Sequence, residues 1–129
     1  MLLLVDAANV VGTRPDGWWR DRAGAAGRLV ARLADLPGTQ LAGVDVDEVV
    51  VVLEGRARDG CAVTDTGAVR VVHAPACGDD ALAARCGPGV VLVTADRELG
   101  RRADAAGAGL LSPSRLLGVL DARRRPGPR

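Results

Sequence analysis

The run LLLV at residues 2–5, closed at once by Asp6, indicates the fold class of this chain. All four side chains are apolar, without the alternation of polar and apolar residues that marks a half-exposed strand. Further short apolar runs lie at residues 49–53, 69–72 and 90–93, with a weaker one at 109–111. Runs of this length are typical of parallel strands that are buried on both faces. The sequence therefore predicts a mostly parallel sheet of about five strands.

The segments between these runs predict helices and loops. Residues 19–36 place apolar side chains at helical spacing and end at a Pro-Gly stop signal. Further helices are expected over residues 80–85, over residues 97–106, and from Ser112 onward, where Pro113 suits the first turn. Residues 38–47 and 55–67 have the composition of loops.

Strands that alternate with helices within 129 residues predict one α/β domain. We expect a three-layer α/β/α sandwich of Rossmann-like type over residues 1–122, with helices on both faces of the sheet. Residues 123–129, which hold arginines and prolines, are expected to form a disordered tail. Because 48% of the residues are hydrophobic, the chain can bury a core without disulfides.

The composition excludes several chemistries. All 17 basic residues are arginine, so a Walker A phosphate loop and a Schiff-base lysine are impossible. The single histidine leaves no two-histidine zinc motif, and neither serine lies in a Gly-x-Ser-x-Gly frame. The net charge of +1 gives no general signature of nucleic-acid binding. Three cysteines without a Cys-x-x-Cys pair predict free thiols in a reducing cytoplasm, and the short apolar start predicts no signal peptide or membrane span.

Acidic residues follow four of the apolar runs, where an open α/β sheet carries its ligand site. They are Asp6, Glu54, the pair Asp79 and Asp80, and Asp96, and Asn9 adds a neutral oxygen. Each acid alone could be a helix N-cap, which contributes about 0.5 to 2 kcal/mol. Together they would repel, by roughly 4 kcal/mol for two carboxylates about 4 Å apart at an effective dielectric near 20. We therefore expect Mg²⁺ or Mn²⁺ at this edge, where a metal-activated water can hydrolyse a phosphodiester bond.

Three segments resemble the NYN branch of the PIN-like ribonuclease domains. They are LLLVDAANVVG at residues 2–12, GDDAL at residues 78–82, and VLVTADRE at residues 91–98. The resemblance extends over roughly residues 2–122, with the three short motifs in the family's order. It implies a PIN-like fold and metal-dependent cleavage of RNA, with Asp6, Asp80 and Asp96 as metal ligands and Asn9 as a positioning residue. Asp79 is the alternative to Asp80. We favour Asp80 because of its distance from the apolar residues that follow.

The candidate site is completed by residues that lie near the acids in the sequence. Glu54 is a further candidate metal ligand, and Asp79 with Asn9 would orient water or the metal shell. The candidate RNA contacts are Arg14, Trp18, Arg56 and Arg97. The alternatives are core packing for the tryptophan and a solvated face for the arginines.

The sequence thus predicts a small cytoplasmic, metal-dependent ribonuclease. One alternative is a hydrolase of a small phosphoester or nucleotide pyrophosphate, which the same metal chemistry would serve. The other is a non-catalytic RNA-binding or regulatory module on the same fold. The sequence leaves the oligomeric state open, a homodimer included.

Overall fold

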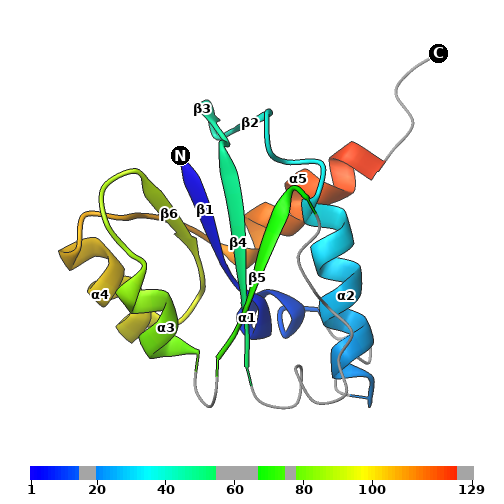
Figure 1. Cartoon of the computed structure of the whole chain (residues 1–129), viewed down its shortest axis with the longest axis horizontal. Helices are drawn as coiled ribbons and strands as arrows, with labels where there is room; N and C mark the ends of the chain where they lie inside the picture. Colours follow the sequence, from blue (N-terminus) through cyan, green and yellow to red (C-terminus); the bar gives the residue numbers. More distant parts are fainter. Residues whose placement is uncertain (15–19, 55–66, 75–77, 125–129) are drawn as a thin grey trace.

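The computed structural model describes residues 1–14, 20–54, 67–74 and 78–124. Its main sheet has five parallel strands in the order β5-β4-β1-β6-β7 (Figure 1). Their bounds are Leu2–Asp6 for β1, Glu48–Leu53 for β4, Val69–His73 for β5, Val90–Val93 for β6 and Gly109–Leu111 for β7. The predicted parallel sheet is confirmed, and all five predicted strands lie in it.

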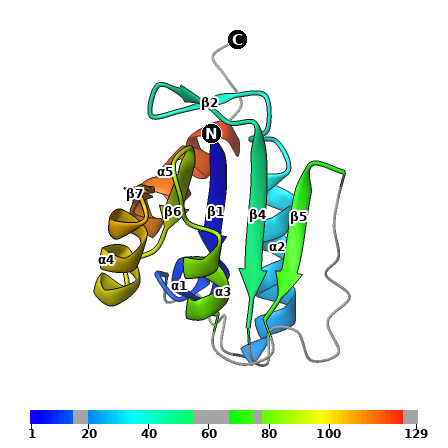
Figure 2. The same cartoon turned by 60° about the vertical axis from the view of Figure 1, so that its left-hand side comes forward.

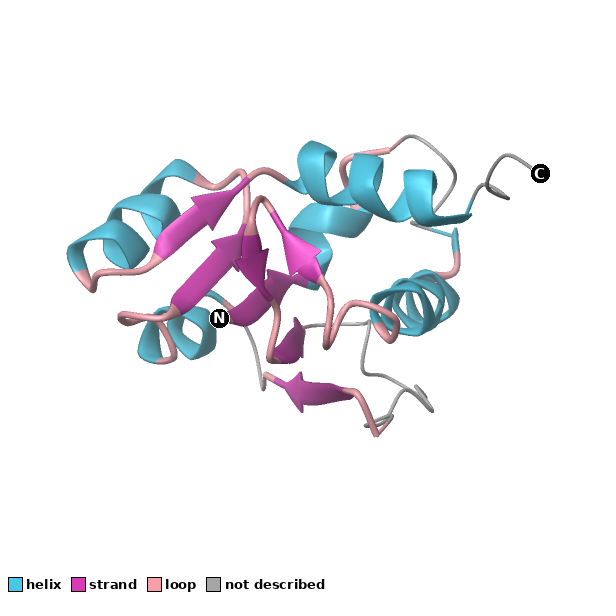
Figure 3. Ribbon diagram, turned by 90° about the horizontal axis from the view of Figure 1, so that it is seen from above, coloured by secondary structure: helices cyan, strands magenta, loops and turns pink. Residues whose placement is uncertain are grey.

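Helices cover both faces of this sheet (Figures 2 and 3). The short α1 (Ala7–Val11), α2 (Arg22–Leu33) and α5 (Pro113–Arg124) lie on one face. The other face carries α3 (Asp79–Ala84) and α4 (Arg97–Ala105). The fold is therefore the predicted α/β/α sandwich. None of the described helices combines the length and apolarity needed to cross a membrane.

The central strands explain why the apolar runs are continuous. Leu3 and Val5 of β1 belong to the core shared with α2 and α5, whereas Leu4 belongs to the core under α3 and α4. All three side chains are fully buried. Successive side chains of a strand point to opposite faces, so a sheet covered on both faces needs apolar residues at every position.

Two elements were not predicted. Helix α1 is one short turn, begun by Asp6, whose side chain accepts a hydrogen bond from the backbone N–H of Asn9. The hairpin of β2 (Gln40–Leu41) and β3 (Val44–Asp45) lies within the predicted loop 38–47. Its central residues Ala42 and Gly43 have φ of 52° and 80°, the left-handed pair of a two-residue hairpin turn. Alanine rarely adopts this conformation, so Ala-Gly did not signal the turn.

The predicted helix boundaries also need correction. The helix expected over residues 19–36 is shorter, and α5 continues through Arg123 and Arg124 into the stretch expected to be disordered. The expected N-cap of α5 is confirmed, because the Ser112 hydroxyl accepts a hydrogen bond from the backbone N–H of Arg115 at 3.2 Å.

One carboxylate joins α5 to α2 and to Arg14, which lies just after α1. Asp121 accepts a hydrogen bond from Arg14 at 2.6 Å and another from Arg32 of α2 at 2.6 Å. Hydrogen bonds from Arg14 and Arg32 lower the pKa of Asp121 to about 2. The carboxylate therefore stays ionised, and bound to both arginines, well below neutral pH.

We expect Asp121→Asn to lower the melting temperature at pH 7, because two arginines lose their shared anion. A depressed carboxyl pKa stabilises the folded state above the unfolded pKa of 3.8, and this contribution disappears as the pH falls through about 2. The difference between wild type and variant should thus be constant from pH 5 to 7 and vanish toward pH 2. Thermal denaturation across this range checks it, with the exposed Asp104→Asn as the control. A difference independent of pH would contradict the ion pair as its cause.

Candidate active site at the carboxyl edge of the sheet

The candidate site lies between the carboxyl ends of β1 and β6, which are neighbours in the sheet. The chain leaves β1 into α1 on one face and leaves β6 into α4 on the other. Where the connections after two neighbouring strands run to opposite faces, an open parallel sheet has a crevice in which ligands bind. Asp6 ends β1, and Thr94 follows the last residue of β6, so both lie at this crevice.

Asp6 is the most deeply placed acid of the site, with 7% of its surface exposed. Its Oδ1 accepts a hydrogen bond from the backbone N–H of Asn9 at 3.3 Å, and its Oδ2 accepts one from the Thr94 hydroxyl at 3.0 Å. Burial, together with the negative charges of Glu54 and Asp79, raises the pKa of Asp6 to about 6, although the two hydrogen bonds lower it. Asp6 therefore lies within the electrostatic reach of two other carboxylates.

The loop after β6 is fixed to Asp6 and to α1 by hydrogen bonds. The Thr94 hydroxyl, which donates to Asp6, accepts from the backbone N–H of Asp96 at 3.1 Å. The backbone N–H of Ala95 donates to Oδ1 of Asn9 at 2.7 Å. Asn9 therefore positions this loop through its amide oxygen. Thr94 is a site residue that the candidate set omitted, although it stands in the Thr-x-Asp motif.

Asp96 has the alternative role that the sequence left open for it. Its Oδ1 accepts a hydrogen bond from the backbone N–H of Leu99 at 2.9 Å, so it is the N-cap of α4. The cap and a metal-binding role are compatible, since a carboxylate has a second oxygen. Asp96 is joined to Asp6 through the Thr94 hydroxyl.

Glu54 follows β4 and reaches the start of α3. Its Oε2 accepts a hydrogen bond from the backbone N–H of Gly78. A Cβ atom at residue 78 would lie 2.6 Å from Oε2, so any other residue there would push the end of the Glu54 side chain aside. Gly78 therefore suits this approach, and its place directly before the two aspartates was the available signal for it.

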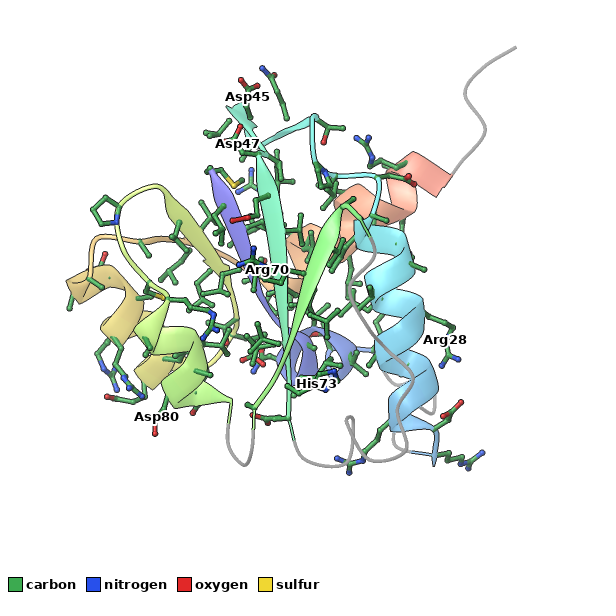
Figure 4. All side chains as sticks on the ribbon, in the orientation of Figure 1. Arg28, Asp45, Asp47, Arg70, His73 and Asp80 are labelled. Carbon is green, nitrogen blue, oxygen red and sulfur yellow. The ribbon has the colours of Figure 1, made fainter. Side chains whose placement is uncertain are left out.

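The two adjacent aspartates have different surroundings. The side chain of Asp80 is 91% exposed and forms an ion pair with Arg102 at 3.1 Å. Figure 4 shows it projecting from α3 away from the sheet. Asp79 is half-buried, and its charge acts on the carboxyl group of Asp6. The charges of Glu54 and Asp79 thus act on Asp6, whereas Asp80, the ligand that the sequence favoured, is exposed and paired with Arg102.

The donor atoms fit a small divalent cation that keeps part of its water shell. Asp6, Glu54 and Asp79 supply hard carboxylate oxygens, the ligands that Mg²⁺ and Mn²⁺ prefer. Within the described ranges, no three acidic, histidine or cysteine side chains are already gathered closely enough to hold an ion. Each of Asp6, Glu54 and Asp96 has an oxygen engaged in a backbone hydrogen bond. The set therefore suits an ion bound by one or two carboxylates and several waters.

The candidate RNA contacts divide into three cases. Arg14 is bound to Asp121 and so belongs to the α2–α5 face. Arg97, the first residue of α4, is exposed beside Asp96. Trp18 and Arg56 lie outside the described residues, so their roles stay predictions.

The fold and this acidic edge define a three-layer α/β domain with a candidate metal site at the carboxyl edge of its sheet. The structure is similar to that of Rae1 (YacP) from Bacillus subtilis, with a TM-score of 0.69 and 18% sequence identity over 95% of this chain and 74% of that chain. A single-residue mutant of Rae1 gives a TM-score of 0.69 and 20% identity over 95% of this chain and 75% of that chain. No family model and no curated protein matches the sequence.

Proposed function

We propose that this chain is a divalent-metal-dependent ribonuclease that hydrolyses phosphodiester bonds. The observation that carries the proposal is the placement of Asp6 within reach of the charges of Glu54 and Asp79, at a crevice of the sheet. Carboxylates that repel in a half-buried position are stabilised by a cation. The resemblance of three motifs to the NYN branch and the fold shared with Rae1 support the choice of reaction.

Asp6, with Glu54 or Asp79, would hold the ion together with several waters, and the remaining carboxylates, Asp96 included, would bind those waters. When bound, Mg²⁺ or Mn²⁺ supplies a water of lowered pKa and stabilises negative charge on the phosphate. Thr94 orients Asp6 by donating to its Oδ2, and Asn9 holds the loop that carries Asp96. Arg97 directly follows Asp96 and is exposed, and it would contact a phosphate of the substrate.

Two other functions remain as competing proposals. A hydrolase of a small phosphoester or nucleotide pyrophosphate would use the same carboxylates. A non-catalytic RNA-binding module would keep the fold without turnover. The activity that we propose requires no membrane partner, and we propose the cytoplasm as its location.

A cleavage assay tests the proposal and separates these alternatives. Labelled single-stranded and structured RNA, and a nucleotide pyrophosphate, are incubated with purified protein in Mn²⁺, in Mg²⁺ and in EDTA. We expect RNA cleavage with either ion and none in EDTA. Hydrolysis of the pyrophosphate alone would support the small-substrate alternative. RNA binding without cleavage under every condition would support the binding module.

A further inference from the structure

A groove separate from the acidic edge lies among α1, α2 and α5. It is bordered by Val10 and Val11 of α1. Its volume is about 680 Å³. Apolar side chains, including Leu29 of α2 and Leu117 of α5, line part of it, and four arginines line the rest: Arg14, Arg28, Arg32 and Arg123. A volume between about 300 and 1,000 Å³ is typical of sites for small organic ligands.

Among the described residues, the lining of the groove carries more arginines than carboxylates. Four arginines line it, together with the two carboxylates of Asp35 and Asp121. Asp121 is shared by Arg14 and Arg32. Arg28 is exposed, and Figure 4 shows it projecting from α2 away from the sheet. These charges are complementary to an anion.

Arg32 offers a hydrogen-bond donor that no described residue uses. Its Nη2 is bound to Asp121, but its Nε is buried and has no acceptor within the part of the chain that the structure describes. Buried polar groups are usually paired, so an unpaired donor in a pocket calls for an explanation. Arg32 is therefore a wall residue of the groove, whereas the exposed guanidinium groups of Arg28 and Arg123 are the ones open to a phosphate.

Helix α1 places the groove next to the candidate active site. Asn9 of α1 is bound to the loop after β6, whereas Val10 and Val11 of the same helix line the groove. The same short helix thus borders both the candidate active site and the groove. A nucleic acid strand held at the acidic edge can reach the groove with a neighbouring nucleotide.

We propose that this groove binds a nucleoside phosphate, with the phosphate on the arginines and the base against the apolar side chains. In an RNA strand, this would be a nucleotide that flanks the cleaved bond. The identity of the strand as a substrate rests on the proposed function, whereas binding of a nucleoside phosphate does not.

Binding measurements in EDTA test the groove without requiring catalysis. The probes are a labelled single-stranded RNA, followed by fluorescence anisotropy, and AMP, inorganic phosphate and adenosine, followed by methyl NMR shifts of Leu29 and Leu117. The variant is Arg28→Glu, at an exposed position. Arg115→Glu, which makes the same change of charge at an exposed position of α5 outside the groove, is the control.

We expect Arg28→Glu to weaken RNA binding about tenfold and to reduce the slope of its salt dependence by about 0.7 for each phosphate that the variant no longer binds. Arg115→Glu should leave the affinity within about twofold of wild type. AMP should shift the Leu29 and Leu117 methyl signals more than phosphate or adenosine does. An affinity for RNA well above that for AMP would identify a strand as the ligand, and equal affinities would identify a free nucleotide; both support the site.

Equal losses for the two variants would overturn the proposal, because they would show that only net charge matters. Absence of methyl shifts with AMP and RNA would overturn it as well. If Arg28→Glu binds and cleaves RNA as wild type does, the groove proposal is refuted and the proposed function stands. If the protein binds a nucleotide in the groove but cleaves no RNA, the proposed function is refuted and the groove proposal stands.

Discussion

Asp6→Asn should lower the rate of RNA cleavage at least about a thousandfold, equivalent to about 4 kcal/mol of transition-state stabilisation. Asp6 is the buried member of the acidic group, and the charges of Glu54 and Asp79 reach it. The substitution replaces a charged carboxylate with a neutral amide, whose oxygen binds a divalent cation more weakly. Single-turnover cleavage with saturating Mn²⁺ measures the loss of rate, and isothermal titration with Mn²⁺ measures the loss of affinity.

The same substitution should stabilise the metal-free protein at neutral pH, which distinguishes loss of function from loss of fold. A carboxyl pKa raised to about 6 from 3.8 means that the folded state resists ionisation of Asp6. This cost is absent below pH 3.8, grows as the pH rises through about 6, and reaches about 3 kcal/mol above that. In EDTA, the variant should therefore gain in melting temperature over wild type between pH 4 and pH 7.

Mn²⁺ should reverse this order by stabilising wild type and leaving Asp6→Asn unchanged, because only a protein that binds the ion gains from it. Thermal denaturation of wild type and Asp6→Asn at pH 4 and pH 7, with and without Mn²⁺, gives the melting temperatures for these comparisons. An inactive variant whose melting temperature does not gain on that of wild type between pH 4 and pH 7 would contradict the burial of the Asp6 charge. A variant that still cleaves RNA would refute the assignment of Asp6.

Asp79→Asn should weaken Mn²⁺ binding at least about tenfold and lower the cleavage rate, whereas Asp80→Asn should leave both within about threefold of wild type. The two residues are adjacent and the substitution is identical, so each variant is a matched control for the other. Asp79 acts on Asp6 through its charge, and Asp80 is exposed and paired with Arg102. Loss of an exposed ion pair costs at most about 1 kcal/mol.

Titration of Mn²⁺ into both variants shows which of the two aspartates binds the ion. Cleavage rates at saturating Mn²⁺ show whether a variant also loses activity once the ion is bound. A larger loss for Asp80→Asn would contradict the grouping seen in the structure. It would restore Asp80, the ligand that the distance from the following apolar residues favours in the sequence.

The strands were predictable from the sequence because burial on both faces requires a continuous run of apolar residues. Every position of the runs that became β1 and β4 must be apolar, as Leu4 and Val50 on one face and Leu3 and Val51 on the other illustrate. Helix α1 has no such record, because a helix of one turn is too short to show a period. The hairpin was missed because its turn uses alanine at a positive φ.

The acidic edge was predictable as a group but not in its details. Which of Asp79 and Asp80 faces the site depends on the rotation of α3 about its axis. Leu82, buried under α3 and three residues after Asp79, fixes that rotation. Residues three apart share a helix face, so the spacing from Asp79 to Leu82 was an available signal that favours Asp79.

The assignment of Arg14 shows the limit of proximity in the sequence. It lies near Asp6 along the chain, yet its partner Asp121 is 107 residues away. No local pattern around Arg14 contains that partner. Long-range ion pairs of this kind depend on how the helices pack, which follows from the whole core.

The order of the strands determines when the crevice can form during synthesis. β1 is made first but lies in the middle of the sheet, between β4 and β6, and Asp6 at its end is completed by Thr94 and Asp96. A growing chain cannot assemble the crevice until β6 and the loop after it have left the ribosome. A chain that the ribosome releases before that point has β1 and Asp6 but lacks the crevice.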